Sequence, residues 1–293
     1  MRIGNNPLGE AIEEIYEKTF KKHPYRTLPI GKDEHINAYN FKKTYNHYKK
    51  WYVPNNAVLI VSGRTTIEEV KKFAQKYFGK LKPIELPKRI RIKEPYNEKT
   101  ETIHKEVKRV KSYIYKRNYQ SPNHNQSSAN VHKKHAKPLL LLAHYLGYNT
   151  KSIMYKEIVR EKKLALSLHC SQSYSTRDPS HGFTISAKIS KDQSFEKVSN
   201  EIDSIIKKVT TEKIPQKDID RCINEVELMG MYDADGNNKI SSILTSYLNG
   251  VSLDEINNWP DALKEIKPND LLEAAKAVFS QKPVVDVRIS PKS

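Results

Sequence analysis

Strand-forming segments are distributed very unevenly along this chain of 293 residues. In residues 1–82 the pattern predicts three helices but only one good strand, the apolar run AVLIVSG at 57–63. A single strand cannot form a stable sheet, because its backbone groups need neighbouring strands. After residue 98, strands are predicted in pairs with helices grouped behind them. The first part therefore resembles half of a folding unit, and the second resembles a complete one.

The three helices of the first part are indicated by apolar side chains that recur at helical spacing. The first ends before Pro24, and the second covers about 37–51. The third begins after Thr66, which can form a capping box with Glu69, and ends at Gly79. The signals for this third helix agree with one another.

The second part is predicted to be an α+β domain with an antiparallel sheet, because paired strands and grouped helices favour that fold class. We divide the chain into an incomplete first domain at 1–82, a proline-interrupted linker at 83–97 and a complete domain at 98–293. The expected strands are 100–107, 111–119, 164–174, 182–189 and 284–290.

The chain carries 51 Lys and Arg against 34 Asp and Glu, a formal net charge of +17. Such a balance attracts anions, nucleic acid among them. The lysines are spread along the chain rather than gathered in one block, however. The alternation KSYIYKRNYQ at 111–120 could suit single-stranded nucleic acid, but an ordinary strand explains it as well. Nucleic-acid binding is therefore unlikely by this reasoning.

Cysteine usage and apolar run length exclude several other classes of protein. Cys170 and Cys222 lie far apart and form no CxxC pair, so neither a disulfide scaffold nor a cysteine-ligated zinc site is indicated. Both are expected to be buried packing residues. The longest apolar run, 138–143, is far shorter than the ~20 residues that span a membrane.

Metal and nucleophile motifs are missing from the sequence. Neither H-E-x-x-H nor H-x-x-E-H occurs, although GKDEH matches the second pattern at Glu34 and His35. Gly31 stands where the first histidine would be, and glycine has no side chain to ligate a metal. His132 and His135 could share a helical face, but the two lysines between them oppose metal binding. No P-loop, G-x-G-x-x-G or G-x-S-x-G is present.

Longer stretches of the chain resemble the M16 (pitrilysin-type) zinc peptidases. In the first part these are NNPLGEAIEEIYEKTFKKHPYRTLPIG, HYKKWYVPNNAVLIVSG and VKKFAQKYFGKL, in this order. In the second part, YKEIVREKKLALSLHCSQSYSTRDPSHGFTISAKIS resembles a region of that family's second, non-metal domain. The resemblance covers nearly the whole chain and implies repeated α+β domains that enclose a peptide-binding chamber.

The resemblance also implies where the family's zinc site would lie. Its H-x-x-E-H motif and third ligand would fall upstream of Met1, so no metal ligand or catalytic residue can be assigned in this chain. No cofactor is expected for this chain, whereas intact family members hold zinc. We therefore expect a truncated or split-gene M16 protein that does not hydrolyse peptides alone. The alternative is a non-catalytic peptide-binding or assembly subunit.

Partners and substrate contacts follow from the same resemblance. The expected partners are a peptide substrate and either a zinc-bearing M16 chain or further copies of this chain. The second domain would hold the peptide as an extended strand. Tyr174, Arg177 and Phe183 are candidate substrate contacts, although a core role explains the two aromatic residues better. No membrane association is expected.

The expected location of the protein depends on its N-terminus. The opening residues MRIGNNPLGEAIEE lack the apolar core of a signal peptide, so a cytoplasmic location is expected by default. An export signal in a preceding part stays open.

Overall fold

The structure is a computed structural model that describes residues 9–88, 90, 92–96, 98–108, 110–128, 131–174, 182–234 and 238–292. The α-helices are α2 (Gly9–Thr19), α3 (Asp33–Asn37), α4 (Phe41–Trp51), α5 (Ile67–Phe78), α6 (Ala136–Ala143), α7 (Phe195–Thr211), α8 (Gln216–Ala234), α9 (Asn238–Leu248), α10 (Leu253–Asn257), α11 (Trp259–Lys264) and α12 (Pro268–Phe279). The strands are β1 (Glu101–Val107), β2 (Tyr113–Tyr119), β3 (Ala165–Gln172), β4 (Phe183–Ile189) and β5 (Val285–Pro291). Short 3-10 turns are η1 (Pro24–Arg26), η2 (Pro54–Asn56) and η3 (Lys133–His135), and π-helical segments are η4 (His144–Tyr148) and η5 (Tyr155–Glu161).

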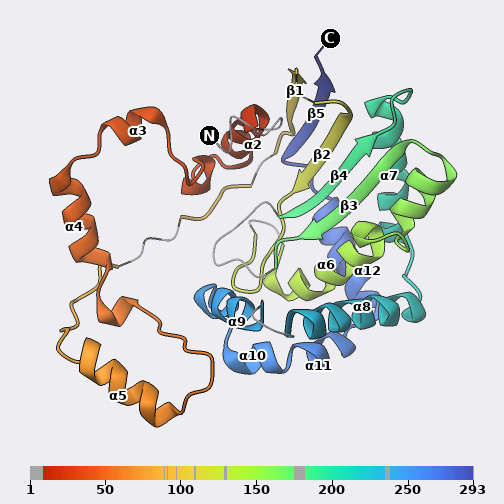
Figure 1. Cartoon of the computed structure of the whole chain (residues 1–293). Helices are drawn as coiled ribbons and strands as arrows, with labels where there is room; N and C mark the ends of the chain where they lie inside the picture. The colour runs from red at the N-terminus through yellow and green to blue at the C-terminus, as the bar shows by residue number, and fades with distance from the viewer. Residues whose placement is uncertain are drawn as a thin grey trace.

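The five strands form one sheet in the order β1-β5-β2-β4-β3 (Figure 1). Three of its pairings are antiparallel, as the sequence predicts, whereas β1 and β5 are parallel. The parallel pair arises because the last strand of the chain is inserted between β1 and β2. Strand β3 is the outermost strand on the other side of the sheet.

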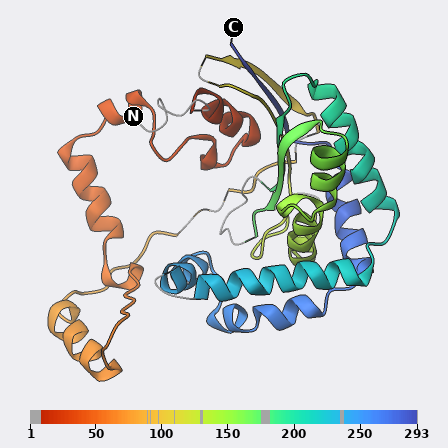
Figure 2. The ribbon, with the colours of Figure 1, turned by 45° about the vertical axis from the view of Figure 1, so that its right-hand side comes forward.

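One face of the sheet is covered by α6, α7 and α12, and this layer contains the main core (Figures 1 and 2). Tyr115 and Ile185 from the strands pack there with Leu139 of α6 and Ile202 of α7. The spacing of the apolar residues on α7 is that of a helix with one buried face, as predicted. Cys170 and Cys222 are both buried in this core, which confirms their packing role.

The opposite face of the sheet is covered at one end by α2. Ala11 and Ile15 of this helix pack against Ile103 of β1 and Val287 of β5, and together they form a second, smaller core. Helix α2 therefore contacts the sheet that is built from the second part of the sequence, although it lies in the first part.

Residues 33–84, here called the outer segment, extend away from the sheet (Figures 1 and 2). Helices α3, α4 and α5 contain no buried residue. Helix α5 has the predicted capping box between Thr66 and Glu69. The strand predicted at 57–63 is wrong, because these residues form no strand and Val58–Val61 are exposed. No strand among the described residues pairs with them, so their apolar character has nothing to pack against.

Candidate ligand-binding pocket

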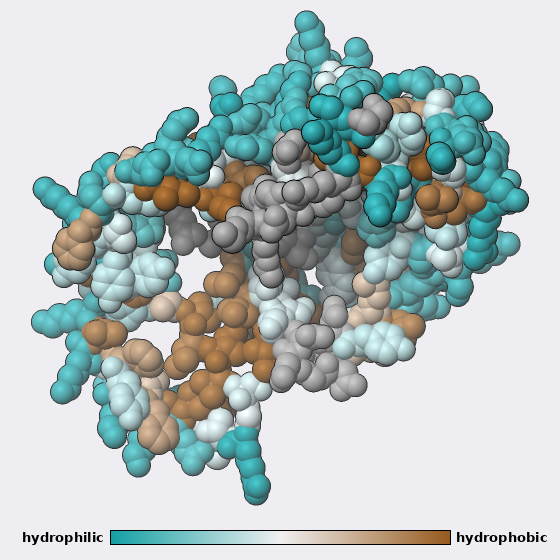
Figure 3. Space-filling view, turned by 45° about the horizontal axis from the view of Figure 1, so that its top comes forward, coloured by the Kyte–Doolittle hydropathy of each residue, from teal (hydrophilic) through white to brown (hydrophobic). Residues whose placement is uncertain are grey.

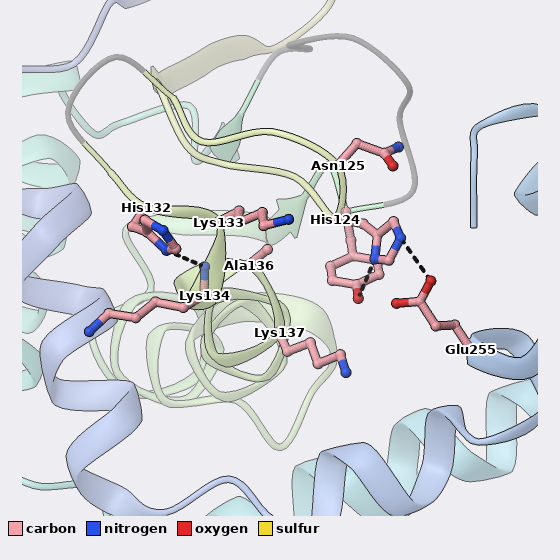
Figure 4. Close-up of a pocket in the computed structure, with 9 residues that line it drawn as sticks. His124, Asn125, His132, Lys133, Lys134, Ala136, Lys137 and Glu255 are labelled. Carbon is pink, nitrogen blue, oxygen red and sulfur yellow. Dashed lines mark hydrogen bonds and ion pairs between the residues drawn. The ribbon is translucent and has the colours of Figure 1, made fainter. Parts of the chain in front are cut away.

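A cavity of about 480 Å³ lies where the loop after β2, the start of α6 and the short helix α10 come together (Figure 4). Its wall contains histidine, lysine and amide side chains with one tyrosine and one carboxylate. The lining residues are His124, Asn125, His132, Lys133, Lys134, Ala136, Lys137, Tyr174 and Glu255.

His124 links two elements across this cavity. Its Nδ1 lies 3.3 Å from the hydroxyl oxygen of Tyr174, and its Nε2 lies 3.2 Å from a carboxylate oxygen of Glu255. Burial raises the pKa of the Tyr174 hydroxyl, and the carboxylate of Glu255 raises it further, so the hydroxyl keeps its proton. The hydroxyl can therefore donate to Nδ1 while Nε2–H donates to Glu255, an arrangement that needs only a neutral imidazole.

The loop that carries His124 is held in place by local hydrogen bonds. The side-chain oxygen of Asn123 accepts the backbone N–H groups of Asn125 and Gln126, as asparagine commonly does in turns. The backbone N–H of His124 donates to the carbonyl of Tyr174, 3.1 Å away. The His124 ring is therefore positioned by both main chain and side chain.

The partners of His124 are also fixed by their own neighbours. Glu255 belongs to a capping box with Ser252 at the start of α10. The ring of Tyr174 packs edge-on against Trp259, with 4.5 Å between ring centroids. These contacts leave the cavity with one well-ordered polar wall.

The remaining charged groups of the cavity are ammonium groups. In Figure 4 the side chains of Lys133 and Lys137 extend toward the side of the cavity that holds His124 and Glu255, whereas Lys134 extends away. Lys137 lies over the ring of Trp259, 5.8 Å from its centroid. Three lysines against one glutamate leave the lining residues with a formal charge of +2 when the histidines are neutral.

The structure describes two of the three predicted substrate contacts and places them in different surroundings. Tyr174 lines the cavity and is 7% exposed. Phe183 is fully buried in the core and packs against Phe279, with 5.3 Å between ring centroids. Arg177 lies outside the described residues. Contact with substrate stays a prediction for all three.

Sequence reasoning missed His124, Glu255 and Lys137. His124 lies in a polar loop that carries no motif, and Glu255 lies on a short helix that was not predicted. The capping pattern of Ser252 and Glu255 was the available signal for that helix. The pairing between Glu255 and His124 has no signal in the sequence, because the two residues are far apart along the chain.

The cavity does not fit zinc. Both ring nitrogens of His124 are engaged by Tyr174 and Glu255, and ammonium groups surround the site. Among the described residues, no group of three or more His, Cys, Asp or Glu could hold a metal ion.

Within the same residues, no helix has the length and apolar character needed to cross a membrane.

The outer strand β3 offers a second polar surface. Ser167, His169 and Ser171 are exposed along this strand, and Lys188 is exposed on its neighbour β4. No strand of the described chain pairs with the outer edge of β3. An extended peptide could add to such an edge through main-chain hydrogen bonds.

Comparisons with known proteins point to one family. Residues 39–226 match the model of the "Peptidase M16 inactive domain". The chain is 23% identical over 295 residues to the zinc protease PqqE of Helicobacter pylori, an alignment that covers 99% of this chain and 64% of that protein. The chain therefore spans less than two thirds of the length of this curated relative.

Solved structures share the fold of the chain. A protease from Helicobacter pylori matches with a TM-score of 0.82 and 21% identity, over 99% of this chain and 68% of that one. A peptidase M16 inactive domain from Pseudomonas fluorescens matches with a TM-score of 0.77 and 15% identity, over 98% and 66% of the two chains. The α+β fold, a five-stranded sheet flanked by helices, is thus the fold of known M16-like structures, as the sequence predicts. With more than half of its length matched by the family model, the chain belongs to the M16 peptidase family and carries that family's inactive domain.

Proposed function

We propose that this chain is the non-catalytic part of an M16 peptidase and works with a zinc-bearing M16 domain. Its sheet domain, from β1 to β5, holds peptide, while the zinc-bearing domain provides the activated water. Peptide hydrolysis needs such a water, and the chain has neither of the two zinc motifs that would activate it. The zinc-bearing domain can belong to a separate chain or to a segment encoded before Met1.

The observation that carries this proposal is the apolar surface of the outer segment. Phe41 and Tyr52 are 81% and 72% exposed, and Leu59 is 57% exposed. Figure 3 shows hydrophobic side chains gathered on this part of the molecule. Exposed apolar patches of this kind mark surfaces that bind other protein segments.

The composition of the outer segment indicates what covers it. Helices α4 and α5 flank the run Val58–Val61, which has the residues of a buried strand but no neighbouring strand among the described residues. A partner that supplies strands beside this run would bury it and the apolar faces of the helices together. A zinc-bearing M16 domain that supplies strands at this position would be such a partner.

The test is to mix the purified chain with the purified zinc-bearing M16 chain encoded in the same genome. We expect a stable complex in size-exclusion chromatography with light scattering. Leu59→Glu should abolish the complex, because it places a charge in the surface that becomes buried. Leu228→Glu, at a residue of α8 that is 51% exposed, is the matched control and should leave the complex intact.

Two results would overturn the proposal. One is a complex that Leu59→Glu and Leu228→Glu affect equally. The other is a stable homo-oligomer of this chain that buries the outer segment and leaves no surface for a zinc-bearing domain.

A further inference from the structure

We propose that the cavity between the His124 loop, α6 and α10 binds a carboxylate group of a peptide, either an acidic side chain or a free C-terminus. This inference rests on the proposed peptide-holding role. It assigns a ligand class to a site that is separate from the strand edge at β3.

The charge of the cavity favours an anion. Two of its lysines, Lys133 and Lys137, extend toward the side that holds His124 and Glu255, and Glu255 is the single carboxylate of the lining. An ammonium group and a carboxylate attract one another at hydrogen-bond distance, most strongly where water is partly excluded. An anionic group between Lys133 and Lys137 would therefore meet two positive charges.

The position of Lys137 is defined before any ligand arrives. Its ammonium lies over the ring of Trp259, which packs against Tyr174. Tyr174 in turn is hydrogen-bonded to His124. A cation held in this way loses less conformational freedom when it binds an anion than a freely moving surface lysine does.

Glu255 makes a peptide a better match for the lining than a simple anion. It lies on the same wall of the cavity, so a ligand with an N–H donor beside its carboxylate can use both charges of the lining. The same carboxylate can accept a backbone N–H from a peptide. A volume of about 480 Å³ is within the range of sites that take ligands larger than a single ion.

Tryptophan fluorescence provides a direct test, because Trp259 lies at the cavity wall beside Lys137. The chain contains two tryptophans, so the measurement uses the Trp51→Phe background to isolate the signal of Trp259. The probe is the peptide acetyl-Glu-Glu-Glu-Glu with a free C-terminus. We expect a saturable change in Trp259 fluorescence that weakens as salt is added, because salt screens charge pairs.

Two double substitutions distinguish binding at the cavity from general attraction to the positively charged chain. Lys133→Gln with Lys137→Gln should weaken binding about tenfold, which corresponds to about 0.7 kcal/mol for each partly exposed charge pair. Lys151→Gln with Lys156→Gln removes the same charge from exposed positions outside the cavity and should leave the affinity unchanged. An equal loss of affinity in both double variants would show that the peptide does not bind at this cavity.

Further probes identify the anion. Acetyl-Gln-Gln-Gln-Gln-amide should not bind, and inorganic phosphate should bind more weakly than the acidic peptide. Tighter binding of phosphate would overturn the carboxylate assignment, and so would no binding of the acidic peptide. The measurement needs no partner chain, so its failure is distinguishable from failure of the proposed complex.

Discussion

At the scale of single residues, the sheet contains a buried charged group, the guanidinium of Arg117. Its guanidinium lies beneath α7, where Nη2 donates to the Ser199 hydroxyl at 2.8 Å and Nε lies 3.7 Å from a carboxylate oxygen of Asp286. Asp286 also accepts a hydrogen bond from the Tyr115 hydroxyl at 2.6 Å. Buried charges of this kind are tolerated only when they are paired and hydrogen-bonded.

Removing one partner from this network should therefore be costly. We expect Asp286→Ala to lower the free energy of unfolding by about 2 kcal/mol, because it leaves the buried Tyr115 hydroxyl without its carboxylate acceptor. It also removes one of the two carboxylates beside Arg117, which keeps its ion pair with Asp203. Urea unfolding at pH 7 measures the difference. Asp192→Ala, at an exposed turn position, is the control and should change stability by less than about 0.5 kcal/mol. A similar small effect for Asp286→Ala would contradict the role assigned to the network.

At the scale of elements, η4 buries a histidine. His144 is buried and stacks on Tyr148, with 4.0 Å between ring centroids. Burial lowers its pKa from 6.5 to about 4, although Glu225 at 4.0 Å acts in the opposite direction. Burial outweighs the nearby carboxylate, and the positive charge of Arg221 also lowers the pKa of His144. Among the described residues, His144 Nδ1 has no hydrogen-bond partner.

This lowered pKa makes stability depend on pH. Below pH 6.5 the unfolded chain takes up a proton at this position more readily than the folded chain, so stability falls as pH falls from 6.5 to about 4. The loss is about 3 kcal/mol at about 1.4 kcal/mol per pH unit. His144→Phe keeps an aromatic ring but removes the proton site. Between pH 7 and pH 4, the free energy of unfolding of this variant should fall by about 3 kcal/mol less than that of the parent protein.

Unfolding of both proteins in urea across this pH range provides the comparison. His104→Phe, at an exposed position of β1, should keep the pH dependence of the parent protein. If His144→Phe also keeps it, the burial of His144 does not control acid stability.

Most elements of the sheet domain were predictable from the sequence, because each has a signal within its own residues. The apolar face of α7 is a local pattern of this kind. In the outer segment, the capping box of Thr66 and Glu69 is another. The run at 57–63 was predicted wrongly, because the same apolar residues describe a strand whether or not a partner strand is present. The pocket was predicted only at Tyr174, since its other residues meet through tertiary contacts.

At the scale of the whole molecule, the sheet domain and the outer segment differ in whether their apolar side chains are buried. The sheet domain buries its apolar side chains in one main core and in a second core under α2. The outer segment leaves its apolar side chains exposed. Since exposed apolar surface is unfavourable in water, the outer segment is the part of this chain that a partner would stabilise most.

We propose that this chain takes part in peptide hydrolysis only together with a zinc-bearing M16 domain. The most direct measurement is the cleavage of a quenched fluorescent peptide by the purified chain alone, by the zinc-bearing M16 chain alone and by the two together. We expect no cleavage by this chain alone and a rate for the mixture well above that of the zinc-bearing chain, abolished by a metal chelator. Chelator-sensitive cleavage by this chain alone, or a mixture no faster than the zinc-bearing chain, would contradict the account.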